Sequence, residues 1–155
     1  MTNYVLGFRF RESRGRGIEV ALIKKNKPHW QAGKLNGIGG KVEGTDLTRY
    51  TAMEREFEEE TGAHIPSFQW RLFAELQHDG NVVHCFTSFG ECKLRQTTAE
   101  HVDWYGTQEL AGIITGRPIM QNLLWLIPLA LDADNVVAVI KDPSIIPKAP
   151  NVQMA

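Results

Sequence analysis

The sequence from Gly39 to Ala63 reads GGKVEGTDLTRYTAMEREFEEETGA, and its second half carries an unusual density of negative charge. Five glutamates fall between Glu54 and Glu60, and Arg55 is the one cation among them. Like charges three or four residues apart on a helix cost about 0.2–0.5 kcal/mol per pair in water. A helix selected only for stability would dilute such a cluster with lysine, so the pattern indicates that a positive partner is missing from the chain.

The spacing of these glutamates places three carboxylates on one face of a helix. We expect this helix to run from about Leu47 to Thr61 and to end at Gly62, a typical C-terminal stop signal. Residues three and four positions apart share a helix face. The acidic face therefore contains Glu56, Glu59 and Glu60, and a neighbouring apolar face contains Tyr50, Met53 and Phe57.

The acidic face has the chemistry of a site for a hard divalent cation. Two carboxylates about 6 Å apart repel by about 0.7 kcal/mol in water and about 2.8 kcal/mol at an effective dielectric near 20. A divalent cation reverses the sign of that energy. Oxygen ligands without histidine or cysteine favour Mg²⁺ or Mn²⁺ over zinc. In proteins, Mg²⁺ is commonly coordinated by a few carboxylates together with substrate phosphates. The alternative is a helix face that is simply solvated, which the segment EREFEEE alone leaves open.

The double glycine and the acidic helix together resemble the Nudix box, usually written G-x5-E-x7-R-E-U-x-E-E-x-G-U with U bulky and apolar. Its second half is matched by Arg55, Glu56, Phe57, Glu59, Glu60 and Gly62, with Ala63 as a small residue at the last apolar position. The first half departs from the pattern, because Asp46 stands at the first acidic position and one extra residue precedes Arg55. The role of Asp46 is therefore open, and Glu43 is the alternative for it.

The resemblance implies the α/β fold of the family, an α/β/α sandwich around a mixed β-sheet. It also implies Mg²⁺- or Mn²⁺-dependent hydrolysis of a nucleoside diphosphate linked to another group. By the same resemblance Glu56, Arg55 and Glu59 are the catalytic residues, with Glu56 as general base and Arg55 orienting a carboxylate. The implied metal ligands are Glu56, Glu59, Glu60, the carbonyl of Gly40 and, from a loop outside the box, Glu100. An ordinary exposed glutamate is the alternative for Glu100.

The segments GKLNGIGGKVE and MQNLLWLIPLAL are similar to those around the base site of the MutT-like branch, which cleaves nucleoside triphosphates to monophosphate and pyrophosphate. ADP-ribose is the second substrate class, and a non-catalytic nucleotide-binding module is the third alternative. Amides both donate and accept hydrogen bonds, so the base preference stays open. The residues expected to contact the substrate are Asn36, Gly39, Gly40, Lys41, Gln121 and Asn122.

The remaining chain predicts strands on both sides of the box helix. Alternating or β-branched apolar residues favour strands at 3–10, 17–25, 68–78, 82–92, 102–106 and 135–141. Helices are expected at 107–113 and 120–131, and the glycine-rich segment 27–46 is expected to be a loop. We expect one Nudix domain over residues 1–141 and an extended, proline-containing tail over 142–155.

Composition limits the partners of the protein. The chain has 155 residues, 43% of them hydrophobic, and a net charge of −1, which disfavours binding to a nucleic-acid polymer. No segment has the length and apolarity of a membrane span, and the N-terminal sequence does not resemble a secretion signal. Two cysteines, Cys85 and Cys92, are too few for a disulfide scaffold. We expect a cytoplasmic monomer or homodimer that acts on a nucleotide.

Overall fold

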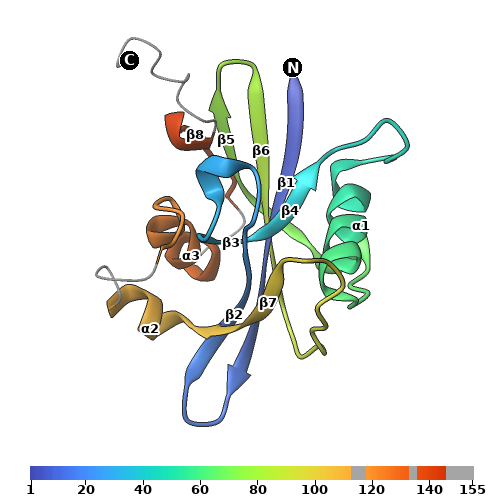
Figure 1. Ribbon diagram of the computed structural model, residues 1–155. Helices are drawn as coiled ribbons and strands as arrows, with labels where there is room; N and C mark the ends of the chain where they lie inside the picture. Colours follow the sequence, from blue (N-terminus) through green and yellow to red (C-terminus); the bar gives the residue numbers. More distant parts are fainter. Residues whose placement is uncertain (113–117, 133–135, 146–155) are drawn as a thin grey trace.

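One mixed eight-stranded sheet forms the centre of the molecule (Figure 1). The computed structural model describes residues 1–112, 118–132 and 136–145. The strands are β1 Thr2–Ser13, β2 Gly17–Lys24, β3 Leu35–Asn36, β4 Ile38–Lys41, β5 Arg71–His78, β6 Asn81–Phe89, β7 His101–Gly106 and β8 Ala138–Lys141. Their order is β3-β2-β1-β6-β5-β8, with β4 also paired to β1 and β7 to β2. The pairs β1–β6 and β5–β8 are parallel and the other pairs are antiparallel.

Helices cover both faces of this sheet, as the predicted α/β/α sandwich requires (Figure 1). The helix α1 Arg49–Thr61 lies on one face, and α2 Thr107–Gly112 and α3 Leu123–Asp132 lie on the other. Successive side chains of a strand point to opposite faces. In β1 the expected alternation is confirmed, since Leu6, Phe8 and Phe10 pack on the α3 side and Val5 packs on the α1 side.

The segment Asp79–Gly80 forms the predicted hairpin turn between β5 and β6. Both residues have positive φ angles, 46° and 73°, and the flanking residues His78 and Asn81 are paired. Positive φ at both central positions is the geometry of the turn that matches the twist of a two-residue hairpin. This hairpin places β6 beside β1, at the centre of the sheet.

Several expected boundaries differ from the structure, among them the start of β5, at Arg71 rather than Phe68, and the end of β6, at Phe89 rather than Cys92. The segment 27–46 was expected to be a loop, but it contains β3 and β4, because β1 and β2 offer paired edges to these short segments. The helix α1 begins at Arg49 rather than Leu47, and α3 begins at Leu123 rather than Met120. Several predicted positions, 113, 135 and 146–155, lie outside the described residues.

The first residues after β8 do not form an extended tail. Asp142 is buried, and its backbone N–H donates to the carbonyl of Gln77 at 3.1 Å. The short 3-10 helix Pro143–Ile145 follows it. Ile145 packs against the core on the α3 side, so this segment is part of the packed domain.

Within the described ranges, no helix has both the length and the apolarity needed to cross a membrane.

Candidate active site

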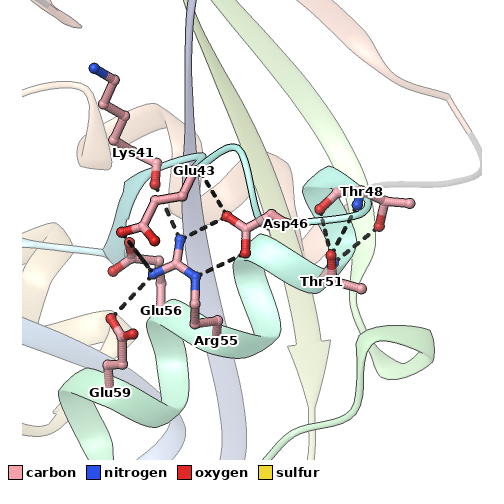
Figure 2. A network of polar contacts seen from close by, with 8 residues as sticks. All are labelled: Lys41, Glu43, Asp46, Thr48, Thr51, Arg55, Glu56 and Glu59. Atoms are coloured by element: carbon pink, nitrogen blue, oxygen red, sulfur yellow. Dashed lines mark hydrogen bonds and ion pairs between the residues drawn. The ribbon is translucent and has the colours of Figure 1, made fainter.

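The helix α1 is fixed at both ends, which sets the direction of its acidic face. Thr48 and Thr51 form a reciprocal capping box, in which each hydroxyl accepts a hydrogen bond from the other residue's backbone N–H (Figure 2). Such a cap satisfies backbone donors that the first turn leaves free. At the other end Gly62 has a φ of 74°, the left-handed conformation that glycine adopts at lowest cost. Met53 and Phe57 between these ends are fully buried, which confirms the predicted apolar face.

The two glycines of β4 allow this strand to approach both β1 and α1. A Cβ atom on Gly39 would lie 1.9 Å from the carbonyl oxygen of Val5. A Cβ atom on Gly40 would lie 2.5 Å from Oε1 of Glu56. Any other residue would force these groups apart, so the double glycine brings the backbone of β4 against the carboxylate of Glu56.

Arg55 is the centre of a polar network between the loop after β4 and the helix (Figure 2). Its Nε and Nη2 donate to the two oxygens of Asp46, each at 2.9 Å. Its Nη1 donates to Glu56 at 3.0 Å and to Glu59 at 3.2 Å, and Nη2 also reaches the carbonyl of Lys41 at 3.2 Å. A guanidinium suits this role because its donors form a rigid planar fork.

The structure decides between Asp46 and Glu43 as the partner of this arginine. Asp46 accepts a bidentate pair of hydrogen bonds, whereas the nearest oxygen of Glu43 lies 3.8 Å from Nη1. The bonds from Arg55 lower the pKa of Asp46, and the same bonds raise the pKa of Arg55. Asp46 also accepts a hydrogen bond from the backbone N–H of Glu43 at 2.8 Å. The loop that contains the extra residue is therefore held by a bond between two of its own residues.

Burial raises the pKa of two carboxyl groups on the acidic face. For Glu60 burial is the largest cause and, together with the charges of Glu56, Glu100 and Glu59, it raises the pKa to about 7. For Glu56 burial again raises the pKa, while Arg55 opposes the shift. One oxygen of Glu60, Oε2, is buried without a hydrogen-bond partner among the described residues. A buried unpaired carboxylate oxygen is costly, and a cation relieves that cost.

The donor set fits a hard divalent cation, although the carboxylates are not gathered around one point. Across the described part of the chain, no three aspartate, glutamate, histidine or cysteine side chains form a ready-made metal-binding group. The guanidinium of Arg55 bridges Glu56 and Glu59. The residues nevertheless suit Mg²⁺ or Mn²⁺, because the side chains are carboxylates and Glu60 has an unpaired oxygen.

Glu100 is buried and tied to the loop after β2 instead of being an ordinary exposed glutamate. Its carboxylate accepts from Lys25 Nζ at 3.2 Å and from the backbone N–H groups of Asn26 at 2.6 Å and Lys27 at 3.4 Å. These bonds outweigh burial and lower the pKa of Glu100. Its charge still acts on Glu60, so it lies close to the acidic face.

A cavity of about 300 Å³ opens beside Gly39 and Gly40. Its walls include apolar side chains of the α3 side of the sheet, among them Leu6, Trp30 and Met120. Gly40 belongs both to this cavity and to the contact with Glu56. The cavity and the acidic face are therefore adjacent, with the backbone of β4 between them.

The predicted substrate-contacting residues divide between the cavity and the surface. Asn36, Gly39, Gly40, Lys41 and Asn122 line the cavity. Gln121 is exposed in the turn before α3 and is not among the residues that line it. The Asn36 amide is engaged at both ends, since Nδ2 donates to Gln31 at 3.1 Å and Oδ1 accepts from the N–H of Gly37 at 2.8 Å.

Several cavity residues did not enter the set predicted from the sequence, and three of them are Lys25, Gln31 and Ile145. Lys25 and Gln31 line the cavity, and the charge of Lys25 acts on Glu60. Ile145 closes the wall from a segment expected to be a loose tail. For Lys25 the available signal was its position as a cation directly after a buried strand. The tail's apolar pair at 145–146 gave no comparable signal.

Known proteins resemble this chain in sequence family and in fold. The family described as NUDIX domain matches residues 3–120. A search of curated protein sequences finds no match. The NUDIX domain of Shewanella oneidensis NrtR, solved with ADP ribose, has a TM-score of 0.70 at 17% identity over 84% of this chain and 86% of its own. A solved MutT structure, from work on Aliivibrio salmonicida and Vibrio cholerae, has a TM-score of 0.65 at 20% identity over 85% of this chain and 98% of its own.

A further match is a MutT/nudix family protein from Enterococcus faecalis, with a TM-score of 0.61 at 18% identity over 67% of this chain. The alignment spans 43% of that longer protein. At these identities the solved structures show a shared fold, while the family match covers most of the chain and includes the acidic helix. The chain therefore belongs to the NUDIX domain family, and it shares the fold of solved MutT proteins.

Proposed function

We propose that the protein hydrolyses a nucleoside triphosphate to the monophosphate and pyrophosphate with the help of Mg²⁺ or Mn²⁺. The observation that carries this proposal is the position of Gly40, which lines the cavity and lies against the carboxylate of Glu56. A base in the apolar cavity directs its phosphates past β4 toward the acidic face.

The residues of the chain have distinct roles in this proposal. Glu56 is buried beside β4, and its raised pKa suits a general base that takes a proton from the attacking water. Arg55 orients Glu56 and Glu59 through its fixed donors. Lys41 attracts the phosphates from the edge of the cavity. The oxygens that would hold a cation come from Glu56, Glu59, Glu60 and the carbonyl of Gly40, with Glu100 close by.

The cation would neutralise negative charge on the non-bridging phosphate oxygens and lower the pKa of a bound water.

We also propose that the protein acts in the cytoplasm, where its two free cysteines, Cys85 and Cys92, stay reduced.

ADP-ribose is the second candidate substrate, because the NUDIX domain of NrtR was solved with ADP ribose. A hydrolysis panel distinguishes the two. It contains ordinary and oxidised nucleoside triphosphates, deoxynucleotides and ADP-ribose with Mg²⁺ or Mn²⁺, and it resolves phosphate from pyrophosphate. Pyrophosphate from a triphosphate supports the proposal. Release of AMP from ADP-ribose without hydrolysis of any triphosphate would make ADP-ribose the substrate instead. The absence of hydrolysis for every compound would contradict the enzymatic assignment.

A further inference from the structure

The inner wall of the cavity contains a buried amide with one unpaired end. Asn122 lines the cavity and is 6% exposed. Its Oδ1 atom is buried and has no hydrogen-bond partner among the described residues. Its Nδ2 atom donates to Oδ2 of Asp142 at 3.4 Å. One end of the amide is therefore bonded to the protein, and the other end has no partner among the described residues.

Asp142 is itself held in place, so it imposes a direction on that amide. It is 7% exposed, and its Oδ1 accepts from the N–H of Ser144 at 3.0 Å and from the Ser144 hydroxyl at 2.6 Å. The other oxygen faces Asn122. An ionised carboxylate only accepts hydrogen bonds, so the amide nitrogen of Asn122 must face Asp142. The amide oxygen must then be the end that remains available.

We propose that Asp142 is a positioning residue that fixes Asn122 as a hydrogen-bond acceptor for an exocyclic amino group of the nucleobase. This inference rests on the proposed function, since it takes the cavity as the base site. It goes further by selecting bases that carry an amino group, such as guanine, adenine or cytosine, over bases that lack one. A site built to bond a substrate N–H rejects an analogue without it, because its own buried acceptor stays unpaired.

The substitution Asp142→Asn reverses the direction of the Asn122 amide with almost no change of shape. The backbone N–H of Ser144 still requires an acceptor, so Oδ1 of the new amide remains on that side. Its nitrogen then faces Asn122 and donates. Asn122 must turn its oxygen toward residue 142 and present its nitrogen to the base. The site thereby offers a donor where the wild-type protein offers an acceptor.

Two further variants isolate this effect. In the exchange N122D/D142N, the amide at 142 donates to the carboxylate at 122, and an oxygen again faces the base. Ser144→Ala removes one hydrogen bond to Asp142 and leaves the backbone N–H, so it disturbs the same turn without reversing the amide.

The measurement is kcat/KM for pairs of triphosphates that differ only by an amino group. GTP is compared with ITP, and ATP with purine riboside triphosphate. In the wild-type protein and in S144A, we expect loss of the amino group to lower kcat/KM at least about tenfold in one pair. In D142N that penalty disappears or reverses, and in N122D/D142N it returns.

Two outcomes overturn the inference: a wild-type protein indifferent to both deletions, or a D142N variant with unchanged preference. If no nucleotide is turned over, the proposed function fails, and calorimetric binding of GMP against IMP and of AMP against purine riboside monophosphate decides the inference by the same pattern. If circular dichroism shows that D142N does not fold, the exchange variant and Asn122→Leu carry the test. The inference is supported if N122D/D142N still prefers the triphosphate with the amino group and Asn122→Leu does not. Any other pattern overturns it.

Discussion

The guanidinium of Arg55 joins a loop carboxylate, Asp46, to two helix carboxylates, Glu56 and Glu59. We expect Arg55→Lys to lower kcat/KM about 10–100-fold, the usual cost of losing a residue that orients metal ligands. Lysine keeps the charge but cannot make the bidentate pair with Asp46 while also reaching the helix. Steady-state kinetics test this expectation, with Arg49→Lys as the matched control. Arg49 lies in the first turn of the same helix and pairs with Glu75 at 3.1 Å instead of with Asp46, Glu56 or Glu59. Equal activity in both variants would contradict the orienting role.

The exposed carboxylate of Glu59 gives the cleanest test of the metal face. We expect Glu59→Gln to keep the fold and to lose at least about 100-fold in kcat, because it removes a ligand charge without changing side-chain size. Glu58→Gln is the control, since both side chains are exposed, 58% and 53%, and Glu58 pairs with His64 instead of Arg55. Circular dichroism checks the fold of each variant. Comparable kcat values in the two variants would remove Glu59 from the proposed ligands.

At the scale of elements, the close approach of β4 to α1 connects the cavity to the acidic face. We expect Gly40→Ala to reduce kcat at least about tenfold, because the added methyl group would meet the carboxylate of Glu56 at 2.5 Å and displace it. Gly44→Ala is the control, because nothing lies within 4 Å of a Cβ atom at that position. The measurement is kcat together with the melting temperature. A Gly40→Ala enzyme as active as the control would show that this contact is not needed.

The elements differ in how far the sequence could predict them. The helix α1 was predictable because its apolar residues Met53 and Phe57 repeat with helical period and Gly62 provides a stop signal. The predicted start was too early, because Leu47 is apolar and was counted as the first residue of the helix. In the structure Leu47 is 90% exposed and lies before the Thr48 cap. The strand β4 was missed because IGGK has no alternating pattern, and its pairing is decided by β1.

The site shows the same division between local and distant information. The face of Glu56, Glu59 and Glu60 follows from spacing alone, since all three lie on one helix. The bidentate partner of Arg55 does not, because the extra residue before Arg55 left the role of Asp46 open, with Glu43 as the alternative. Asp142 was assigned to a tail, and only the packing of β8 against β5 brings it beside Asn122. Contacts between distant segments are determined by the tertiary fold and carry no local pattern.

At the scale of the whole molecule, the repulsion on α1 acts on stability as well as on chemistry. The helix packs its apolar face on the sheet and carries its carboxylates on the face next to the cavity, so the folded state holds together charges that the unfolded chain separates. A cation that binds only the folded state raises stability by RT ln(1 + [L]/Kd), about 2.7 kcal/mol at a hundredfold excess over Kd. For a chain of 155 residues this corresponds to an increase of about 5–10 °C in Tm.

We therefore expect millimolar Mg²⁺ to raise Tm by several degrees in the absence of any nucleotide. Differential scanning calorimetry measures the shift, with NaCl at matched ionic strength to separate binding from screening. The variant E59Q/E60Q is the control, because it removes two of the three mutually repelling charges. It should start with a higher Tm without metal and respond little to Mg²⁺, since both the repulsion and the ligands are reduced. An equal Mg²⁺ shift in this variant and in the wild-type protein would place the cation elsewhere. No shift in either protein would mean that the acidic face is simply solvated.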